Sequence, residues 1–258
     1  MQTLDVKSYW DTFWENRAIP GSQNDRLFQE LSIQAIIRLL KPDDIALNVG
    51  CGDGYGFDEY CSIVKKITGM DYSVEAIDKA NEIHSDLIDV GKAEFIVGNL
   101  LEIQPELLEK FDVVISERCL CNLDTEEKQK NALLIIAKYL KPKGLALICE
   151  PSLQGYDAID KIRQRLELEP IKRHWHNVLL NEDMLTELEP FIIQERYTFG
   201  VYTLLSRLFY PLYIHPQEPQ FDNDINKIAS ILCREIMTEP QYKNIPSQHT
   251  LYILRRVD

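Results

Sequence analysis

The sequence predicts an α/β fold built around a mostly parallel sheet, with helices on both of its faces. Between residues 45 and 151, short apolar runs alternate with segments of helical periodicity, a pattern typical of β-α-β units. The first apolar run, at residues 46–49, breaks into a glycine-rich segment at residues 50–56. An acidic residue, Asp71, ends the next apolar run 19 residues beyond Gly52, a spacing that puts a carboxylate at the ribose of a bound nucleoside.

Two helices are expected before the first strand. The dipeptide Pro20-Gly21 separates them, and Lys41-Pro42 ends the second. Aromatic stripes at helical spacing usually pack into a core, although they can also line a ligand site. The apolar faces consist of Tyr9, Trp10, Phe13 and Trp14 on the first helix, and of Leu27, Phe28, Leu31, Ala35 and Leu39 on the second.

Helices and strands then continue in alternating order. A helix after the glycines carries Phe57, Tyr60, Cys61 and Val64 on one face. A later helix follows Asp124, its expected N-cap residue, and stops at Lys141-Pro142. Beyond Pro151 we expect helices at residues 157–168 and 181–189, and strands near residues 191–199 and 248–255.

The last two strands enclose an insertion at about residues 201–246. These roughly fifty residues are rich in Tyr, Pro and Phe, and they have helical periodicity from 221 to 233. The connection is far longer than the ~2 to 5 residues of a simple hairpin loop, so we expect a cap over the substrate. Without repeats, low-complexity segments or a Gly/Ser linker, a second independent domain is not expected.

The glycine-rich segment does not match two common nucleotide-binding motifs. A dinucleotide fingerprint needs G-x-G-x-x-G, but its last position is Tyr55 counted from Gly50 and Phe57 counted from Gly52. A P-loop needs Lys followed by Ser or Thr after the glycines, and this pair does not follow. The G-x-G-x-G run at residues 50–54 instead resembles motif I of the class I S-adenosylmethionine-dependent methyltransferases.

Other segments resemble that family, in the family's own order along the chain. Residues 71–72 resemble motif II, residues 95–100 the third strand and its tip, residues 111–116 the fourth strand, and residues 140–148 the turn and fifth strand. The resemblance implies a Rossmann-like sheet of seven strands, with S-adenosylmethionine as the cofactor. It also implies an N-terminal helical lid over residues 1–42, followed by a methyltransferase domain over residues 43–258.

The resemblance also assigns the cofactor contacts. Asp71 would accept hydrogen bonds from the ribose hydroxyls, Tyr72 would lie against the adenine, and Asn99 would meet the adenine amino group. Asn48 and Asn99 stand where the family usually carries an acid, and an amide keeps an oxygen acceptor but removes a charge. The expected cofactor-binding residues are Asn48, Gly50, Cys51, Gly52, Gly54, Asp71, Tyr72, Asn99, Leu100, Ser116, Trp14, Arg17 and Arg26.

Two arginines are assigned to the cofactor with an alternative left open. In similar methyltransferases the N-terminal helix lies across the cofactor, and Arg17 or Arg26 would then pair with the methionine carboxylate. The alternative is that both are solvated surface residues.

The substrate side depends on the end of the fourth strand and on two histidines. Arg118 would bind an anionic group of the substrate or brace Glu117, and Glu150 would face the site or cap a helix. His174 or His176 would serve as a general base, with surface placement as the alternative. The expected catalytic residues are His174, His176 and Arg118, and the expected substrate contacts are Glu117, Glu150, Trp175, Tyr202, Tyr210, Tyr213 and His215.

No metal is expected, because the histidine pair has no evident third ligand among nearby Cys, Asp or Glu residues. A formal net charge of −13, with scattered basic residues, disfavours a polyanion, so we expect a small-molecule substrate and no nucleic acid. No apolar run reaches the ~18 residues of a membrane span, and the start of the chain lacks a signal-peptide pattern. We therefore expect a cytoplasmic protein without membrane association, and we leave the oligomeric state open.

The expected function is transfer of a methyl group from S-adenosylmethionine to an oxygen of a small metabolite, anionic metabolites included. Transfer to the nitrogen of a small amine is the alternative within this class of enzyme, because an amine needs less help from a base. A third alternative is a non-catalytic subunit that binds S-adenosylmethionine. In that case the amides Asn48 and Asn99 would have replaced the acids after catalytic activity was lost.

Overall fold

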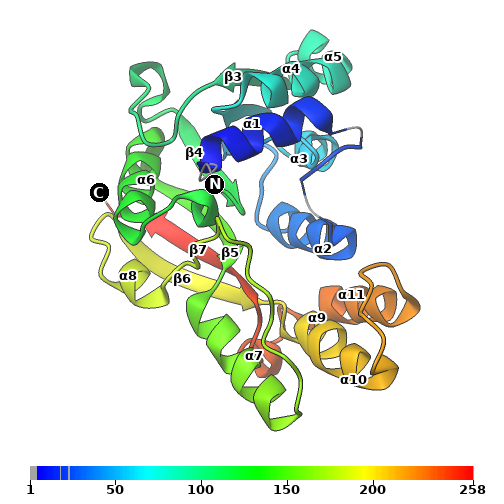
Figure 1. The fold of residues 1–258 in the computed structure, drawn as a ribbon. Coiled ribbons are helices and arrows are strands. Elements are labelled where there is room, and N and C mark those ends of the chain that lie inside the picture. Colours follow the sequence, from blue (N-terminus) through cyan, green and yellow to red (C-terminus); the bar gives the residue numbers. More distant parts are fainter. Residues whose placement is uncertain (1–4, 18, 23, 258) are drawn as a thin grey trace.

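The computed structural model describes residues 5–17, 19–22 and 24–257, and a single sheet of seven strands forms its centre (Figure 1). The strand order is β3-β2-β1-β4-β5-β7-β6. β7 runs antiparallel to both of its neighbours, whereas the pairs among β1 to β5 are parallel. The predicted mostly parallel sheet of seven strands is therefore confirmed. The strands are β1 (Ile45–Val49), β2 (Lys66–Asp71), β3 (Ala93–Val97), β4 (Phe111–Glu117), β5 (Leu140–Pro151), β6 (Phe191–Thr198) and β7 (His249–Arg256).

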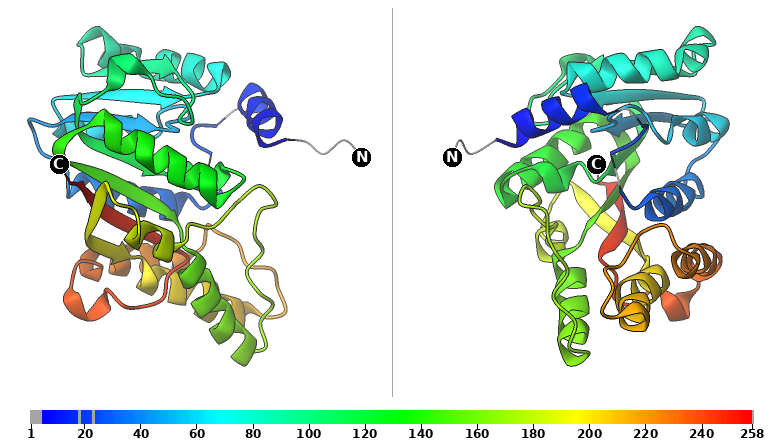
Figure 2. Two further views of the ribbon diagram at one scale, coloured as in Figure 1. Left: turned by 90° about the vertical axis from the view of Figure 1, so that its left-hand side faces the viewer. Right: turned by 45° about the vertical axis from the view of Figure 1, so that its right-hand side comes forward.

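Helices cover both faces of the sheet, as Figures 1 and 2 show. Successive residues of a strand point to opposite faces, so Val114 and Ile115 of β4 belong to two different apolar clusters. Val114 packs in the cluster that includes α6 and α8, and Ile115 in the cluster that includes α2 and α3. Within the described ranges, no helix combines the length and apolarity needed to cross a membrane. The helices outside the insertion are α1 (Val6–Asn16), α2 (Arg26–Ile37), α3 (Phe57–Ile63), α4 (Val74–Ile83), α5 (Ser85–Asp89), α6 (Glu126–Tyr139), α7 (Leu153–Arg165) and α8 (Glu182–Thr186), with short η1 (Pro105–Leu107) and η2 (Leu120–Asn122).

Two helices begin at residues other than those predicted. The N-cap of α6 is Thr125 and not Asp124, because the Thr125 side chain accepts a hydrogen bond from the backbone N–H of Lys128 at 3.2 Å. Asp124 instead pairs with the Lys128 ammonium group at 2.7 Å. The hydroxyl of Ser152 accepts from the N–H of Gly155 at 3.1 Å, and this cap starts α7 four positions before the predicted residue 157.

The insertion at about residues 201–246 folds into helices that lie beside α2 (Figure 1). One buried carboxylate, that of Asp25, joins the two parts. It accepts hydrogen bonds from the Tyr202 hydroxyl at 2.7 Å and from the Arg207 guanidinium, and it also caps the N-terminus of α2. The insertion is therefore fixed to α2. Its elements are α9 (Gly200–Leu204), η3 (Leu205–Phe209), α10 (Tyr210–Ile214), α11 (Asp224–Ile236) and η4 (Pro240–Tyr242).

Candidate active site

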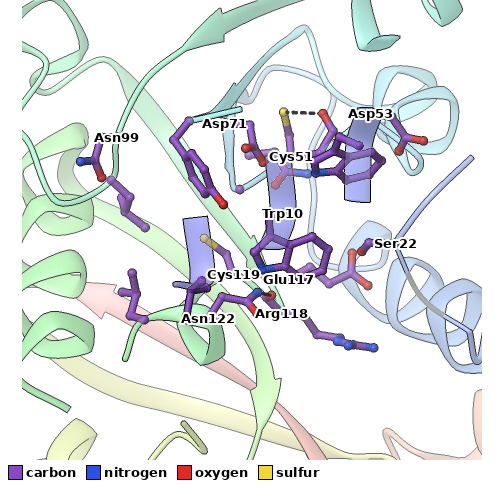
Figure 3. A pocket seen from close by; sticks show the side chains of 18 of the residues that line it. Trp10, Ser22, Cys51, Asp53, Asp71, Asn99, Glu117, Arg118, Cys119 and Asn122 are labelled. Carbon is purple, nitrogen blue, oxygen red and sulfur yellow. Dashed lines mark hydrogen bonds between the residues drawn. The ribbon is translucent and has the colours of Figure 1, made fainter. Parts of the chain in front are cut away.

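A cavity of about 580 Å³ opens at the carboxyl ends of the central strands (Figure 3). β1 lies between β2 and β4, so the order of the strands reverses beside it. Ligands of open α/β sheets bind at such a switch point, and the volume is typical of a site for a small molecule. The lining comes mainly from the glycine-rich loop after β1, from the ends of β2, β3 and β4, and from α1.

The glycine-rich loop forms one wall of the cavity, and at two of its positions only glycine fits. Gly50 and Gly52 have φ angles of 66° and 56°, in the left-handed region that favours glycine. A Cβ atom on Gly52 would lie 2.7 Å from the Trp14 ring, and one on Gly50 would lie 2.4 Å from the Cys119 sulfur. Cys51 also lines the cavity, whereas Gly54 does not, since it packs against His84 beneath the loop.

Asp71 lies beside this loop and is 8% exposed. Its carboxylate accepts from the N–H of Gly52 at 2.9 Å and from the N–H of Ser73 at 3.0 Å. Burial raises the pKa of Asp71, and these N–H groups oppose the rise. The buried hydroxyl of the neighbouring Tyr72, which also lines the cavity, has no hydrogen-bond partner among the described residues. Both residues therefore keep hydrogen-bonding capacity for a ligand.

Asn48 and Asn99, the two amides at positions where an acid was expected, both line the cavity, as does Leu100. Asn48 is buried at the end region of β1. The side chain of Asn99 accepts from the N–H of Leu101 at 3.0 Å and donates to Glu102 at 3.0 Å. Asn99 thus also holds the turn that follows β3.

α1 covers one side of the cavity, with Trp10 and Trp14 among the lining residues. The ammonium group of Lys79 in α4 donates to the carbonyl oxygens of Trp14 and Arg17, which fixes the end of α1. The carboxylate of Asp53 accepts from the N–H of Gly21 at 2.6 Å and so ties the α1–α2 connection to the glycine-rich loop.

Arg17 and Arg26, expected to reach the methionine carboxylate, do not line the cavity. Arg17 donates to the carbonyl oxygen of Gly21 at 3.1 Å and lies over the Phe13 ring. Arg26 donates to the carbonyl oxygen of Pro20 and lies over a second aromatic ring. Backbone carbonyl groups of the α1–α2 connection, together with the rings of Phe13 in α1 and Tyr55 in the glycine-rich loop, therefore hold both guanidinium groups.

Glu117 and Arg118 line the cavity at the carboxyl end of β4 (Figure 3). The Glu117 carboxylate accepts from the Tyr60 hydroxyl at 3.2 Å and from the Ser32 hydroxyl. Burial raises the pKa of Glu117 to about 7, although these two hydroxyls and the nearby Arg118 lower it. Arg118 has a left-handed φ of 54°, and its guanidinium has no hydrogen bond or ion pair to any other described residue.

Ser116 was expected at the cofactor, and Glu150 either at the site or as the cap of a helix; the structure places both beneath the cavity wall and confirms the second alternative for Glu150, which caps the start of η2. Neither residue lines the cavity, and both are 0% exposed. The Ser116 hydroxyl donates to Glu150 at 3.1 Å. The remaining bonds of the Glu150 carboxylate go to backbone N–H groups of the turn after β4, so it faces the protein interior.

The two histidines that we predicted as catalytic also lie outside the cavity lining. The His176 ring packs against Tyr9 at 4.6 Å and against Trp10 at 5.7 Å, measured between ring centroids. His174 stacks on His176 at 5.6 Å, and Trp175 is 62% exposed. Burial and neighbouring positive groups lower the pKa values of both histidines. Trp10 contacts His176 and also lines the cavity, and the charge of Arg118, another lining residue, lowers the pKa of both histidines, so the pair lies next to the lining without belonging to it.

The predicted substrate contacts from the insertion are not at the site either. Tyr202 and Tyr210 are buried, Tyr213 is 73% exposed, and His215 is exposed. No described residue of the insertion lines the cavity, because the insertion packs beside α2. The structure therefore does not place the insertion over this cavity, as expected of a cap; α1 contributes lining residues instead.

Several lining residues escaped sequence reasoning. Asp53 lies inside the glycine motif, and this position could have predicted that it lines the cavity. Tyr60 was assigned to the core alone, and Asn122 had no signal beyond its place after β4. Among the described residues, no group of three or more His, Cys, Asp and Glu side chains is arranged to hold a metal ion.

The residues present fit a nucleoside cofactor. Gly50 and Gly52 let a ligand approach the backbone, Asp71 offers a carboxylate, and Tyr72 offers a free hydroxyl. This fold and this site define a class I S-adenosylmethionine-dependent methyltransferase, with S-adenosylmethionine as the cofactor.

Comparisons with known proteins identify the family. A family model described as Methyltransferase domain matches residues 40–189, and the chain belongs to this family. The protein is therefore an enzyme, and the alternative of a non-catalytic subunit is not retained. The mRNA cap guanine-N(7) methyltransferase of Saccharomyces cerevisiae is 28% identical in an alignment of 120 residues that covers 42% of this chain and only 28% of the yeast protein.

Solved structures with the same fold have low sequence identity. The N-methyltransferase NodS from Bradyrhizobium japonicum WM9, in complex with S-adenosyl-l-homocysteine, has a TM-score of 0.58 at 15% identity, covering 98% of this chain and 100% of that chain. Phosphoethanolamine N-methyltransferase 1 from Haemonchus contortus has a TM-score of 0.61 at 13% identity, covering 98% of this chain and 48% of that chain. At such identities the likeness concerns the fold alone.

Proposed function

We propose that the enzyme transfers a methyl group to an oxygen of a small anionic metabolite. The observation that carries the proposal is the pair at the end of β4: a carboxyl group with a pKa of about 7 beside a guanidinium without a partner among the described residues. When bound, the cofactor supplies a methyl group on a positively charged sulfur atom. The protein then has to align the acceptor, exclude water and take up a proton.

Glu117 is the proposed proton acceptor. With a pKa near 7 the carboxyl group is partly ionised at neutral pH and can take the proton of an attacking hydroxyl. Its bonds from Ser32 and Tyr60 hold the carboxylate in one orientation at the cavity wall. This role replaces the one predicted for His174 and His176, which do not line the cavity.

Arg118 is the proposed contact for an anionic group of the acceptor. A guanidinium binds carboxylate or phosphate with two parallel hydrogen bonds, and the donors of Arg118 are not used by other described residues. Trp10 and Trp14 cover the cavity and would exclude water from the acceptor.

Transfer to nitrogen is the second candidate, because an ionised Glu117 would also attract an ammonium group and accept its proton. RNA is a further possibility raised by the yeast relative, whose name describes an mRNA cap. The net charge of −13 opposes binding of a polyanion, which supports the small molecule over RNA.

The test is transfer of labelled methyl from S-adenosylmethionine to three separated pools: acidic small molecules, amines and RNA. We expect the label in the acidic pool, on products whose fragmentation shows an oxygen-bound methyl group. Arg118→Met should reduce transfer about 10- to 100-fold at limiting acceptor and leave S-adenosylhomocysteine binding unchanged. Arg234→Met is the control, since Arg234 pairs with Glu235 on α11 and does not line the cavity. Label confined to amines or RNA would refute the proposal.

A further inference from the structure

Glu150, at the end of β5, makes an unusual set of hydrogen bonds for a side chain outside the cavity. One carboxylate oxygen accepts from the N–H groups of Cys119 and Leu120, both at 2.9 Å, and from the Ser116 hydroxyl at 3.1 Å. The other oxygen accepts from the N–H of Cys121 at 3.1 Å. Three consecutive N–H groups thus converge on one buried carboxylate.

These N–H groups belong to the turn after β4, which forms part of the cavity wall. Arg118, Cys119 and Asn122 of this turn all line the cavity. The turn is strained, since Arg118 has a left-handed φ of 54°. The side-chain amide of Asn122 closes it by donating to the carbonyl oxygen of Arg118 at 2.8 Å.

The geometry requires a carboxylate rather than an amide at position 150. All four partners donate, and both oxygens of the side chain accept. A glutamine has only one oxygen, so its NH₂ group would face a backbone N–H group or the Ser116 hydroxyl. Burial raises the pKa of Glu150, and the N–H groups oppose that rise by favouring the charged form.

We propose that Glu150 is a positioning residue for methyl transfer: its buried carboxylate fixes the turn at residues 118–122 so that Arg118 faces the methyl acceptor. Glu150 acts through the backbone and touches neither cofactor nor acceptor. The proposal rests on the proposed function only for the role of Arg118 toward the acceptor.

The test compares Glu150→Gln with wild type in three measurements. Hydrogen exchange of the amides of residues 119–121 should become about 10- to 100-fold faster, because each N–H group loses a charged acceptor. Transfer of labelled methyl to the acceptor pool should fall by a similar factor at limiting pool concentration and recover in part at high concentration. Titration with S-adenosylhomocysteine should give an affinity close to that of wild type. Glu94→Gln is the control, because Glu94 binds Lys66 and Thr68 on β2, away from the cavity lining.

Two results would overturn the proposal. One is unchanged exchange at residues 119–121, and the other is a parallel fall in cofactor affinity and acceptor transfer, which indicates general damage. If Glu150→Gln does not fold, Ser116→Ala removes one donor from the same carboxylate and should give the same pattern to a smaller extent. Failure of the proposed function has a different signature: wild-type enzyme would methylate amines or RNA while the exchange result for Glu150→Gln still held.

Discussion

The substitution Glu117→Gln should change how the stability of the folded protein depends on pH. The direction of this change follows from the burial of the carboxyl group. Its pKa rises from the ordinary 4.5 to about 7 in the folded protein. Below pH 4.5 the folded and unfolded chains both hold the proton. Between pH 4.5 and 7 the unfolded chain releases it and the folded chain keeps it, so stability is lost as the pH rises through this window.

The size of the effect follows from the same shift. At about 1.4 kcal/mol for each pH unit, the full loss is about 3 kcal/mol, most of it between pH 5 and pH 8. Glutamine keeps the shape of the protonated acid and cannot ionise. The variant should therefore gain about 2 to 3 kcal/mol of unfolding free energy relative to wild type between pH 5 and pH 8.

The assay is urea unfolding of both proteins without cofactor at pH 5 and pH 8, followed by circular dichroism. Glu94→Gln serves as a control. Although burial opposes it, hydrogen bonds from Lys66 and Thr68 lower the pKa of Glu94 below 4.5, so its contribution to stability changes only at more acidic pH and the difference between this control and wild type should be the same at pH 5 and pH 8. An equal difference between Glu117→Gln and wild type at both pH values would refute the argument for a buried, half-ionised base. In activity assays the same variant should also lose the rise of methyl transfer through neutral pH.

Three further predictions concern the cofactor. Asp71→Ala should weaken S-adenosylhomocysteine binding by about 1.5 to 3 kcal/mol in calorimetric titration. Unchanged affinity would refute the proposal that Asp71 binds the ribose hydroxyls. Gly52→Ala should lower cofactor affinity and melting temperature more than Gly91→Ala does. Both glycines have positive φ angles, but only a Cβ atom on Gly52 would contact Trp14. Equal losses in the two variants would show that backbone strain alone matters. Lys79→Met should speed dissociation of S-adenosylhomocysteine in stopped-flow tryptophan fluorescence, since it frees the end of α1, and an unchanged rate would contradict a lid held at this point.

The cofactor side was predictable because its signals are local. The glycine-rich loop and Asp71 belong to one β-α-β unit, and Gly52 and Asp71 are 19 residues apart in the chain. Within such a unit the chain itself brings the loop and the carboxylate together at the end of the sheet. The lining residues Asn48, Gly50 and Tyr72 lie at the ends of the two strands of this unit, so the same argument predicts them.

The acceptor side was predictable only in part. Position after β4 correctly pointed to Glu117 and Arg118 as cavity residues, but position at the end of β5 left open whether Glu150 faces the site or caps a helix. Glu150 turns inward because three backbone N–H groups of the neighbouring turn need an acceptor. The pattern of a single strand does not contain that information.

By itself, the sequence determined the fold class, the cofactor and the order of the strands along the chain, because periodicity and short motifs act over a few tens of residues. Only the tertiary structure decided which side chains line the cavity beside Arg118. Ser32 and Tyr60 precede Glu117 by 85 and 57 residues, yet they hold its carboxylate. His176 packs against Trp10 outside the cavity lining, although alternation in the sequence made it a candidate base. The packing of α1, α2 and the insertion sets these positions, since contacts between distant segments arise only when the chain folds.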